Sequence, residues 1–211
     1  IADTYQSIKG RGVHKVLPKV KKAVQIDRVR YCLKMDVKKF YPSIDKTIMK
    51  SIVRKKIKCK GTLGLLDNIV DSNCNGLPIG NYISQYLGNL YLSEIDHKLK
   101  EVLMIKYYYR YCDDIIVLCN AKEELHSIRK FVEKELNSLL LTLKRDYSVR
   151  PVRVGVDVLG YVVTPSKVSA RKNIKSRMLA NYSSKSAASY SGWLTHCNGY
   201  RLKLKLEKDN I

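Results

Sequence analysis

The sequence lacks an apolar run long enough to cross a membrane, and it shows no signal peptide. Its six cysteines include no C-x-x-C pair, and no cluster of His and Cys has the spacing of a zinc site. We therefore expect reduced thiols and a cytoplasmic protein that makes no membrane contact. With 211 residues and 45% apolar content, the chain is long enough to bury a core in one or two domains, and composition argues against disorder.

Acidic residues are also scarce. Nineteen Asp and Glu face forty Lys and Arg, which leaves a net charge of +21. Such a surface attracts polyanions over long distances, and nucleic acid is the leading candidate partner. A charge that serves only solubility, or an RNA binder of the ribosomal type, gives the same composition.

Residues 1–30 are polar and basic, and the rest of the first half of the chain alternates between strand and helix patterns. Residues 31–37 alternate as a strand that ends on a carboxylate, and a turn follows at residues 41–43. Apolar residues then recur at helical spacing around residues 48–53 and 65–70. A loop at residues 76–80 precedes one long amphipathic helix, which is marked by Leu87, Leu90, Ile95, Leu99 and Val102.

The second half begins with a predicted hairpin. Two β-rich runs, residues 106–110 and 115–118, flank Tyr111–Asp114. A helix follows at residues 122–139, and short strands follow at residues 141–143 and 156–163. The composition changes from about residue 165: between Lys167 and Lys208, ten Lys and Arg face one acid, Glu207, which predicts a small, basic, helical segment. This order favours an α+β fold, with an antiparallel sheet and helices on one face.

Three acids lie beside apolar strands. Asp36 closes the first strand, and Asp113 with Asp114 sits at the predicted hairpin tip. Neighbouring carboxylates repel each other and persist most easily when a cation neutralises them. Magnesium prefers oxygen ligands, and two such ions can promote transfer of a nucleotide to a 3′-hydroxyl. An Asp-Asp pair taken alone is more often ordinary turn chemistry, and Asp36 alone could be a surface acid.

Six segments in chain order place these acids in a wider pattern. They are Lys34–Tyr41, Gly76–Gln85, Tyr109–Asp114, Leu141–Lys144, Val158–Tyr161 and Ala188–Leu194. The first three resemble the first catalytic motif, the loop-to-helix motif and the Tyr-x-Asp-Asp box of the reverse transcriptase family. The last three resemble the Lys-bearing strand that follows the box in that family, its primer-grip hairpin and its thumb helices. Each segment is weakly specific by itself, and the specificity lies in the shared order and spacing.

The resemblance implies a polymerase palm with an antiparallel sheet and helices. It implies partial fingers at residues 1–30, the palm at residues 31–164 and a small, helical, basic thumb at residues 165–211. Because the chain begins at Ile1, we expect the early fingers to lie mostly upstream of it. The implied activity is RNA-directed DNA synthesis, with an RNA template, a DNA or RNA primer and dNTPs as partners.

The resemblance also assigns the metal site. Asp36, Asp113 and Asp114 would be the catalytic residues and would bind two Mg²⁺ ions, for which Mn²⁺ is a possible substitute. The backbone carbonyl of Val37 would add a further ligand.

Other matched residues would bind substrates. Tyr41 would lie under the sugar and exclude a 2′-hydroxyl, and Lys144 would neutralise triphosphate charge. Gly160 and Tyr161 would support the primer end. The plain alternatives are a core aromatic at Tyr41, a solvated Lys144 or a similar role for its neighbour Arg145, and an ordinary strand glycine.

The loop-to-helix motif, which would contact the template base and incoming nucleotide, departs from many relatives. Ile79 stands before Gly80 where a Gln is common, and Gln85 stands where a Pro is usual. This variant resembles the mutagenic enzymes of diversity-generating retroelements, which commonly work with a small basic accessory protein. Retron-type and defence-associated reverse transcriptases remain open, as do a group II intron-like maturase fragment and a non-catalytic RNA-binding module with a decayed palm.

Overall fold

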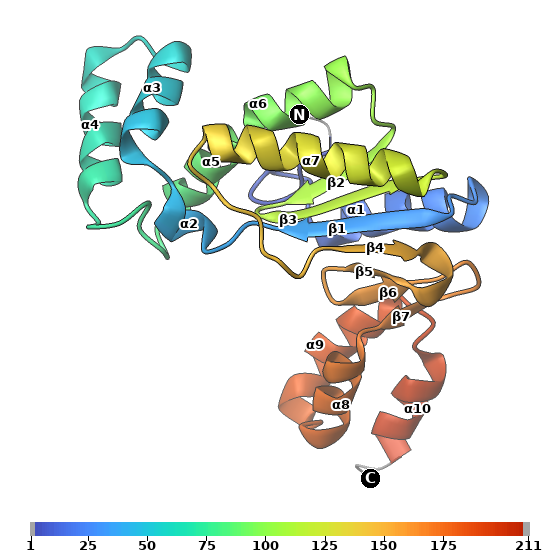
Figure 1. Cartoon of the computed structure of the whole chain (residues 1–211). Helices are drawn as coiled ribbons and strands as arrows, with labels where there is room; N and C mark the ends of the chain where they lie inside the picture. Colours follow the sequence, from blue (N-terminus) through green and yellow to red (C-terminus); the bar gives the residue numbers. More distant parts are fainter. Residues whose placement is uncertain (1–2, 209–211) are drawn as a thin grey trace. The chain divides into compact units, whose positions relative to one another are not determined.

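The computed structural model describes residues 3–208, which form an α+β structure (Figure 1). The chain divides into two compact units. Unit 1 comprises the chain up to Gly12 together with Cys32–Val149, and unit 2 comprises Val13–Tyr31 and the chain from Arg150 onward. This partition describes packing, and the functional division at residues 30 and 164 stays a prediction.

Unit 1 is built on a four-stranded sheet with the order β2-β3-β1-β4. Its strands are β1 (Tyr31–Asp36), β2 (Tyr107–Tyr111), β3 (Asp114–Cys119) and β4 (Ser148–Pro151), the last of which crosses the unit boundary. Strands β2 and β3 pair antiparallel, which confirms the predicted hairpin. Four consecutive residues of β3, Ile115–Leu118, are buried, so this interior strand is covered on both faces.

Unit 1 also contains several helices. They are α2 (Phe40–Ser43), α3 (Lys46–Lys56), α4 (Lys60–Asp71), α5 (Tyr82–Tyr91), α6 (Ser93–His97), the π-helix η2 (Lys98–Val102) and α7 (Lys122–Ser138). Helix α7 packs on β3 and buries Leu125, Ile128, Val132 and Leu136, as its apolar spacing predicts. Asp45 begins α3, because its side chain accepts a hydrogen bond from the backbone N–H of Ile48 at 2.8 Å.

Three local predictions for unit 1 were wrong. The expected turn at residues 41–43 is the short helix α2. The expected single helix through Val102 is divided into α5, α6 and η2, and Val102 itself is 74% exposed. The apolar side chain of Val102 fits the helical spacing of the preceding apolar residues, but it is not part of the buried face that they form. The expected strand at residues 141–143 is reduced to one bridge, between Val37 and Leu143.

Unit 2 contains a second, antiparallel sheet with the order β5-β6-β7. Its elements are α1 (Val13–Lys21), the π-helix η1 (Lys22–Ile26), the 3₁₀ turn η3 (Val152–Val154), β5 (Val156–Val158), β6 (Tyr161–Val163), β7 (Val168–Ala170), α8 (Lys172–Ala180), α9 (Ser184–Thr195) and α10 (Tyr200–Lys208). Met178, Leu194 and Leu206 form the buried core between the last three helices. The predicted helical segment after residue 165 is therefore present, with the strand β7 at its start.

Helix α1 was not predicted, because residues 1–30 were interpreted as polar and basic. Its buried residues Val16, Leu17 and Val20 recur at helical spacing, and α1 packs on β5 and β6. The frequent lysines of this segment lie on the other side of the helix and obscured the apolar stripe.

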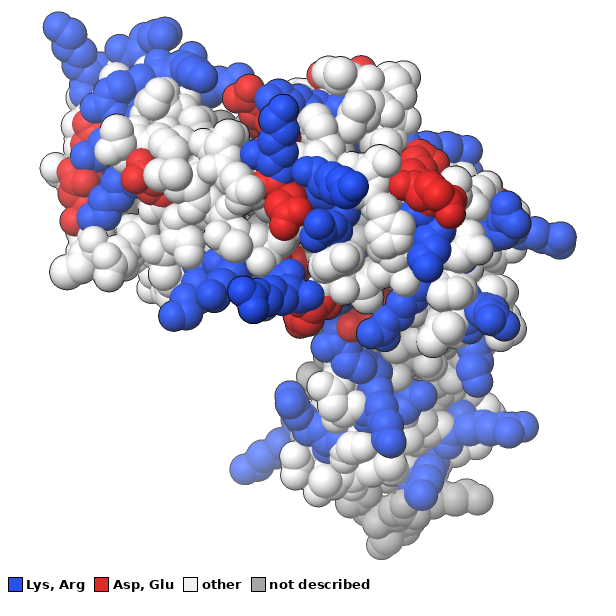
Figure 2. Space-filling model, in the orientation of Figure 1, with Lys and Arg blue, Asp and Glu red and all other residues white. Residues whose placement is uncertain are grey.

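Lys and Arg side chains are spread over both units (Figure 2). All six cysteines lie among the described residues, and none of them forms a disulfide. No helix in residues 3–208 combines the length and the apolar character that a membrane crossing requires.

Candidate active site

The β2–β3 hairpin carries two of the three predicted catalytic acids. Its register pairs Tyr111 with Asp114, so Cys112 and Asp113 form a two-residue loop. Cys112 has φ +56°, in the left-handed region that non-glycine residues rarely adopt. The tight loop places Asp113 at the tip and Asp114 at the first position of β3.

The third acid, Asp36, ends β1, which lies beside β3 in the sheet. The chain after α7 returns alongside it, since the Lys144 N–H donates to the Asp36 carbonyl and the Lys38 N–H donates to the Thr142 carbonyl, each at 2.8 Å. These two bonds flank Val37, so the carbonyl of Val37 points away from residues 142–144. A role for that carbonyl as an additional metal ligand stays a prediction.

The acids create a concentrated negative charge. Burial raises the pKa of Asp113 above its ordinary value, and the negative charge of Asp36 raises it further. Asp36 and Asp113 therefore interact with each other as like charges. A group that neutralises one of them stabilises the ionised form of both.

Two lysines supply positive charge at this site. Lys144 Nζ lies 2.8 Å from Asp36 Oδ1, and Lys34 Nζ lies 3.2 Å from Asp114 Oδ2. The bond to Asp36 raises the pKa of Lys144, so its ammonium form is favoured. The structure thus places the predicted triphosphate-binding Lys144 at the carboxylates, and it adds Lys34.

The donor set fits a divalent cation. Carboxylate oxygens are the ligands that hard cations such as Mg²⁺ prefer, and the two lysine ammonium groups stand in for positive charge at Asp36 and Asp114. Within residues 3–208, no three His, Cys, Asp or Glu side chains are gathered closely enough to hold a metal ion as they stand. A bound cation would therefore compete with the lysines for these carboxylates.

Tyr41, the predicted sugar-contacting residue, lies against the hairpin. The thiol of Cys112 donates to the Tyr41 hydroxyl at 3.4 Å, and burial raises the pKa of Cys112 to about 11. The Tyr41 ring also packs over α5, where a Cβ at Gly88 would lie only 3.2 Å from Tyr41 Cε1. The structure therefore brings Tyr41 and the catalytic loop together.

The loop at residues 76–80 is attached to the same region. The Leu77 N–H donates to the Tyr41 carbonyl at 3.0 Å, and the Leu77 side chain is fully buried. Ile79 is 78% exposed, and Gly80 is exposed with φ +92°. Gln85, on α5, is half-buried and accepts a hydrogen bond from Ser7 in the N-terminal segment. Ile79 is thus open to a ligand, whereas Gln85 is already engaged.

The predicted primer-grip residues belong to unit 2. Tyr161 is 1% exposed, stacks on Trp193 with ring centroids 4.9 Å apart and donates to the Trp193 carbonyl at 3.1 Å. Gly160 has φ +98°, and a Cβ there would lie 2.7 Å from side-chain atoms of Ile174 and Trp193. Both residues hold the β5–β6 hairpin to α8 and α9, and a role at the primer end stays a prediction.

Sequence reasoning missed several residues of the site. Lys34 could have been found, since it shares a strand face with Asp36 two residues later. Asp96 could not, because no local pattern marks the acid that pairs with Arg110 from a different element. The close approach of Gly76 to α2 was also missed, because Gly76 was interpreted only as a residue that marks a loop.

The family described as "Reverse transcriptase (RNA-dependent DNA polymerase)" matches residues 2–163. A search of curated proteins found no match.

Solved structures of telomerases share the fold. Apo telomerase from Candida tropicalis matches with a TM-score of 0.62 and 13% identity over 86% of this chain and 39% of that one. Telomerase from Candida albicans, in complex with a TWJ fragment of telomeric RNA, matches with a TM-score of 0.61 and 12% identity over 81% of this chain and 36% of that one. The chain thus spans well under half the length of these structures, and at such identities they show the fold alone.

Proposed function

The chain belongs to the reverse transcriptase family, and on that premise we propose that it is an RNA-directed DNA polymerase that uses two magnesium ions. The observation that carries the proposal is the grouping of Asp36, Asp113 and Asp114 at neighbouring ends of β1 and β3, flanked by Lys34 and Lys144. A module that only binds RNA has no need of clustered negative charge facing a polyanion.

The three carboxylates and the carbonyl of Val37 would hold the ions, with Mn²⁺ as a possible substitute. When bound, two such metal ions lower the barrier for attack by the primer 3′-hydroxyl and stabilise the leaving pyrophosphate. Lys144 lies next to Asp36 and would move its ammonium group to the triphosphate oxygens of an incoming dNTP. The ring of Tyr41, held between the Cys112 thiol and α5, would occupy the space that a 2′-hydroxyl needs.

The template and primer would be held mainly by charge. The chain has a net charge of +21, and Lys and Arg side chains are scattered over the face shown in Figure 2, with several on α8 and α10. Contacts between such residues and phosphates release counterions, so the affinity for primed RNA should fall steeply with salt. Sequence-independent binding of this kind suits an enzyme that must move along its template.

The test is extension of a primed RNA template with each dNTP omitted in turn. We expect Mg²⁺-dependent synthesis that stops one position before each template base whose complement is missing, because base pairing selects the nucleotide. EDTA should stop the reaction, and ribonucleotides in place of dNTPs should give little product. Synthesis that ignores the omitted nucleotide, or that proceeds without a divalent ion, would contradict the proposal.

We further propose that the exposed Ile79 lowers fidelity opposite adenine, as in enzymes of diversity-generating retroelements. An aliphatic side chain cannot donate the hydrogen bond of an amide, so it constrains the nascent base pair less. Ile79→Gln should therefore reduce misincorporation opposite template adenine by about 10-fold, the scale of one discriminating hydrogen bond. Sequencing of the extension products measures this ratio.

The matched control is Ile79→Leu, which keeps an aliphatic side chain at the same exposed position. It should leave the error spectrum unchanged. If Ile79→Gln also leaves errors opposite adenine unchanged, the assignment to this subclass fails and a retron-type or defence-associated enzyme is favoured.

A further inference from the structure

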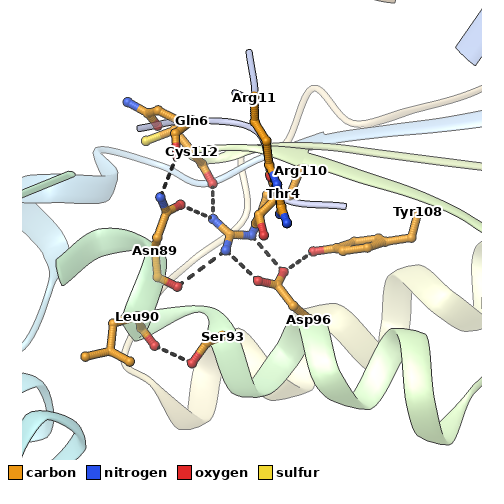
Figure 3. A network of polar contacts seen from close by, with 10 residues as sticks. All are labelled: Thr4, Gln6, Arg11, Asn89, Leu90, Ser93, Asp96, Tyr108, Arg110 and Cys112. Atoms are coloured by element: carbon orange, nitrogen blue, oxygen red, sulfur yellow. Dashed lines mark hydrogen bonds and ion pairs between the residues drawn. The ribbon is translucent and has the colours of Figure 1, made fainter. Parts of the chain in front are cut away.

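Directly before the catalytic loop, β2 buries a charged side chain. Arg110 is 1% exposed and pairs with Asp96 of α6, which is also 1% exposed. The pair is bidentate, with Nε 2.7 Å from Oδ1 and Nη2 2.5 Å from Oδ2 (Figure 3). Tyr108, two residues earlier on the same face of β2, donates its hydroxyl to Asp96. Burial of these charges is costly, and it is tolerated when the polar groups are fully paired.

The remaining donors of Arg110 reach two other elements. Nη1 donates to the carbonyl of Cys112 at 2.9 Å and to Asn89 Oδ1 at 3.1 Å, and Nη2 also lies 3.4 Å from the carbonyl of Asn89 on α5. A guanidinium has five N–H donors in a rigid plane, and here each of the five has an acceptor. The position of the guanidinium is therefore fixed by α5 and α6 together.

The bond to Cys112 acts directly on the catalytic loop. The carbonyl of Cys112 belongs to the planar peptide unit that ends at the nitrogen of Asp113. Cys112 has φ +56°, a conformation that costs free energy in a non-glycine residue and needs an external restraint. By holding this carbonyl, Arg110 sets the orientation of the peptide plane from which the Asp113 side chain projects.

The backbone of Arg110 is restrained as well. Its N–H donates to the Asp3 carbonyl and its carbonyl accepts from the Tyr5 N–H, each at 3.0 Å. Asn89 Nδ2 donates to the Gln6 carbonyl at 2.8 Å, which links the same N-terminal segment to α5. Residues 3–6 therefore lie alongside β2 and near the guanidinium, as Figure 3 shows for Thr4 and Gln6.

We propose that Arg110, held by Asp96, is a positioning residue that fixes the Cys112–Asp113 peptide and thereby presets Asp113 for metal binding. This inference rests on one part of the proposed function, namely that Asp113 is a ligand of a divalent ion. An ion pair that serves stability alone would support the fold without setting the metal affinity of the hairpin.

The test uses a variant that removes the network without leaving a buried charge unpaired. Asp96→Leu, Tyr108→Phe and Arg110→Met are combined, because apolar replacement of a whole buried pair is often tolerated, whereas removal of one partner is not. Arg110→Lys is the second variant, since one ammonium group cannot pair with Asp96 and also reach Cys112 and Asn89. The control replaces Lys98 and Glu135 with Gln, which removes an ion pair of 2.7 Å between the α6–η2 segment and α7.

Each variant is tested in four assays. These are thermal unfolding, a binding titration with primed RNA, extension kinetics that give kcat and the KM for dNTP, and a Mn²⁺ titration followed by electron paramagnetic resonance. In both network variants we expect kcat to fall and the Mn²⁺ midpoint to rise by about 10- to 100-fold, the usual effect of losing a group that orients a metal ligand. The KM for dNTP and the affinity for primed RNA should stay within about twofold of the wild-type values, since the phosphate contacts that set nucleic-acid affinity lie elsewhere. The Lys98–Glu135 control should match the wild type throughout.

The outcomes separate this inference from the proposed function. A folded network variant with wild-type kcat and Mn²⁺ midpoint would show that Arg110 is only structural, and if the triple variant does not fold, Arg110→Lys decides the question. Wild-type protein that binds Mn²⁺ but extends no primer would contradict the proposed function, while the Mn²⁺ midpoints still report on Arg110. Wild-type protein that does neither would overturn both.

Discussion

Asp113→Asn is expected to abolish Mg²⁺-dependent primer extension while leaving RNA binding intact. Asp113 sits at the tip of the β2–β3 hairpin, where burial and the charge of Asp36 both raise its pKa. The substitution keeps the size of the side chain and removes the charge, so the divalent ion proposed to bind here would lose a carboxylate ligand. Loss of several kcal/mol of transition-state stabilisation corresponds to a rate decrease of about 10³-fold or more.

The measurement pairs extension kinetics with a direct RNA-binding titration. Binding should be unchanged or slightly tighter, because the variant removes negative charge from a surface that faces a polyanion. Asp71→Asn is the matched control, since Asp71 is an exposed acid on α4 that pairs with Lys50 at 2.6 Å. If extension survives in Asp113→Asn, the metal assignment is wrong. If RNA binding is lost together with extension, the substitution has damaged the fold.

The hairpin and α7 were predictable because their signals are local. Two β-rich runs on either side of Tyr111–Asp114 predicted the hairpin, and Leu125, Ile128, Val132 and Leu136 recur at the spacing of one helical face. Helix α1 has the same kind of spacing, but basic residues between its apolar positions led to a polar interpretation. The division between α5, α6 and η2 was hidden because apolar residues continue past Leu92, where the helix is interrupted.

The site was only partly predictable, because its residues meet through tertiary structure. Asp36, Asp113 and Asp114 were found from strand-end positions, and the sheet order explains why they lie on neighbouring strands or the adjoining loop. Lys144 reaches Asp36 because residues 142–144 return alongside β1. The sequence predicts a short strand at residues 141–143 but does not indicate which strand it pairs with. Pairing of Arg110 with Asp96 depends on the packing of α6 under β2, and nothing in either segment specifies it.

Gly76 carries the second large expected effect. Gly76 has φ +61°, and a Cβ there would lie 2.0 Å from the Tyr41 carbonyl oxygen and 2.6 Å from the Pro42 carbonyl carbon. These are backbone atoms, which cannot rotate aside as a side chain would. The backbone is also held in place, since the Leu77 N–H donates to the same Tyr41 carbonyl at 3.0 Å. Gly76→Ala must therefore separate the loop at residues 76–80 from α2.

We expect Gly76→Ala to lower the free energy of unfolding by about 2–5 kcal/mol, the sum of backbone strain and overpacking. That is a large share of the roughly 5–15 kcal/mol that stabilises a typical domain. Extension should fall as well, because displacement of Tyr41 also moves its contact with Cys112 beside Asp113.

The control variant Gly80→Ala separates backbone strain from overpacking, since Gly80 has φ +92° and no atom within 4 Å of its Cβ position. Denaturant unfolding should therefore show a loss of only about 1 kcal/mol for Gly80→Ala, from strain alone. Equal losses for the two variants would mean that the contact between Gly76 and α2 does not determine the stability of this loop.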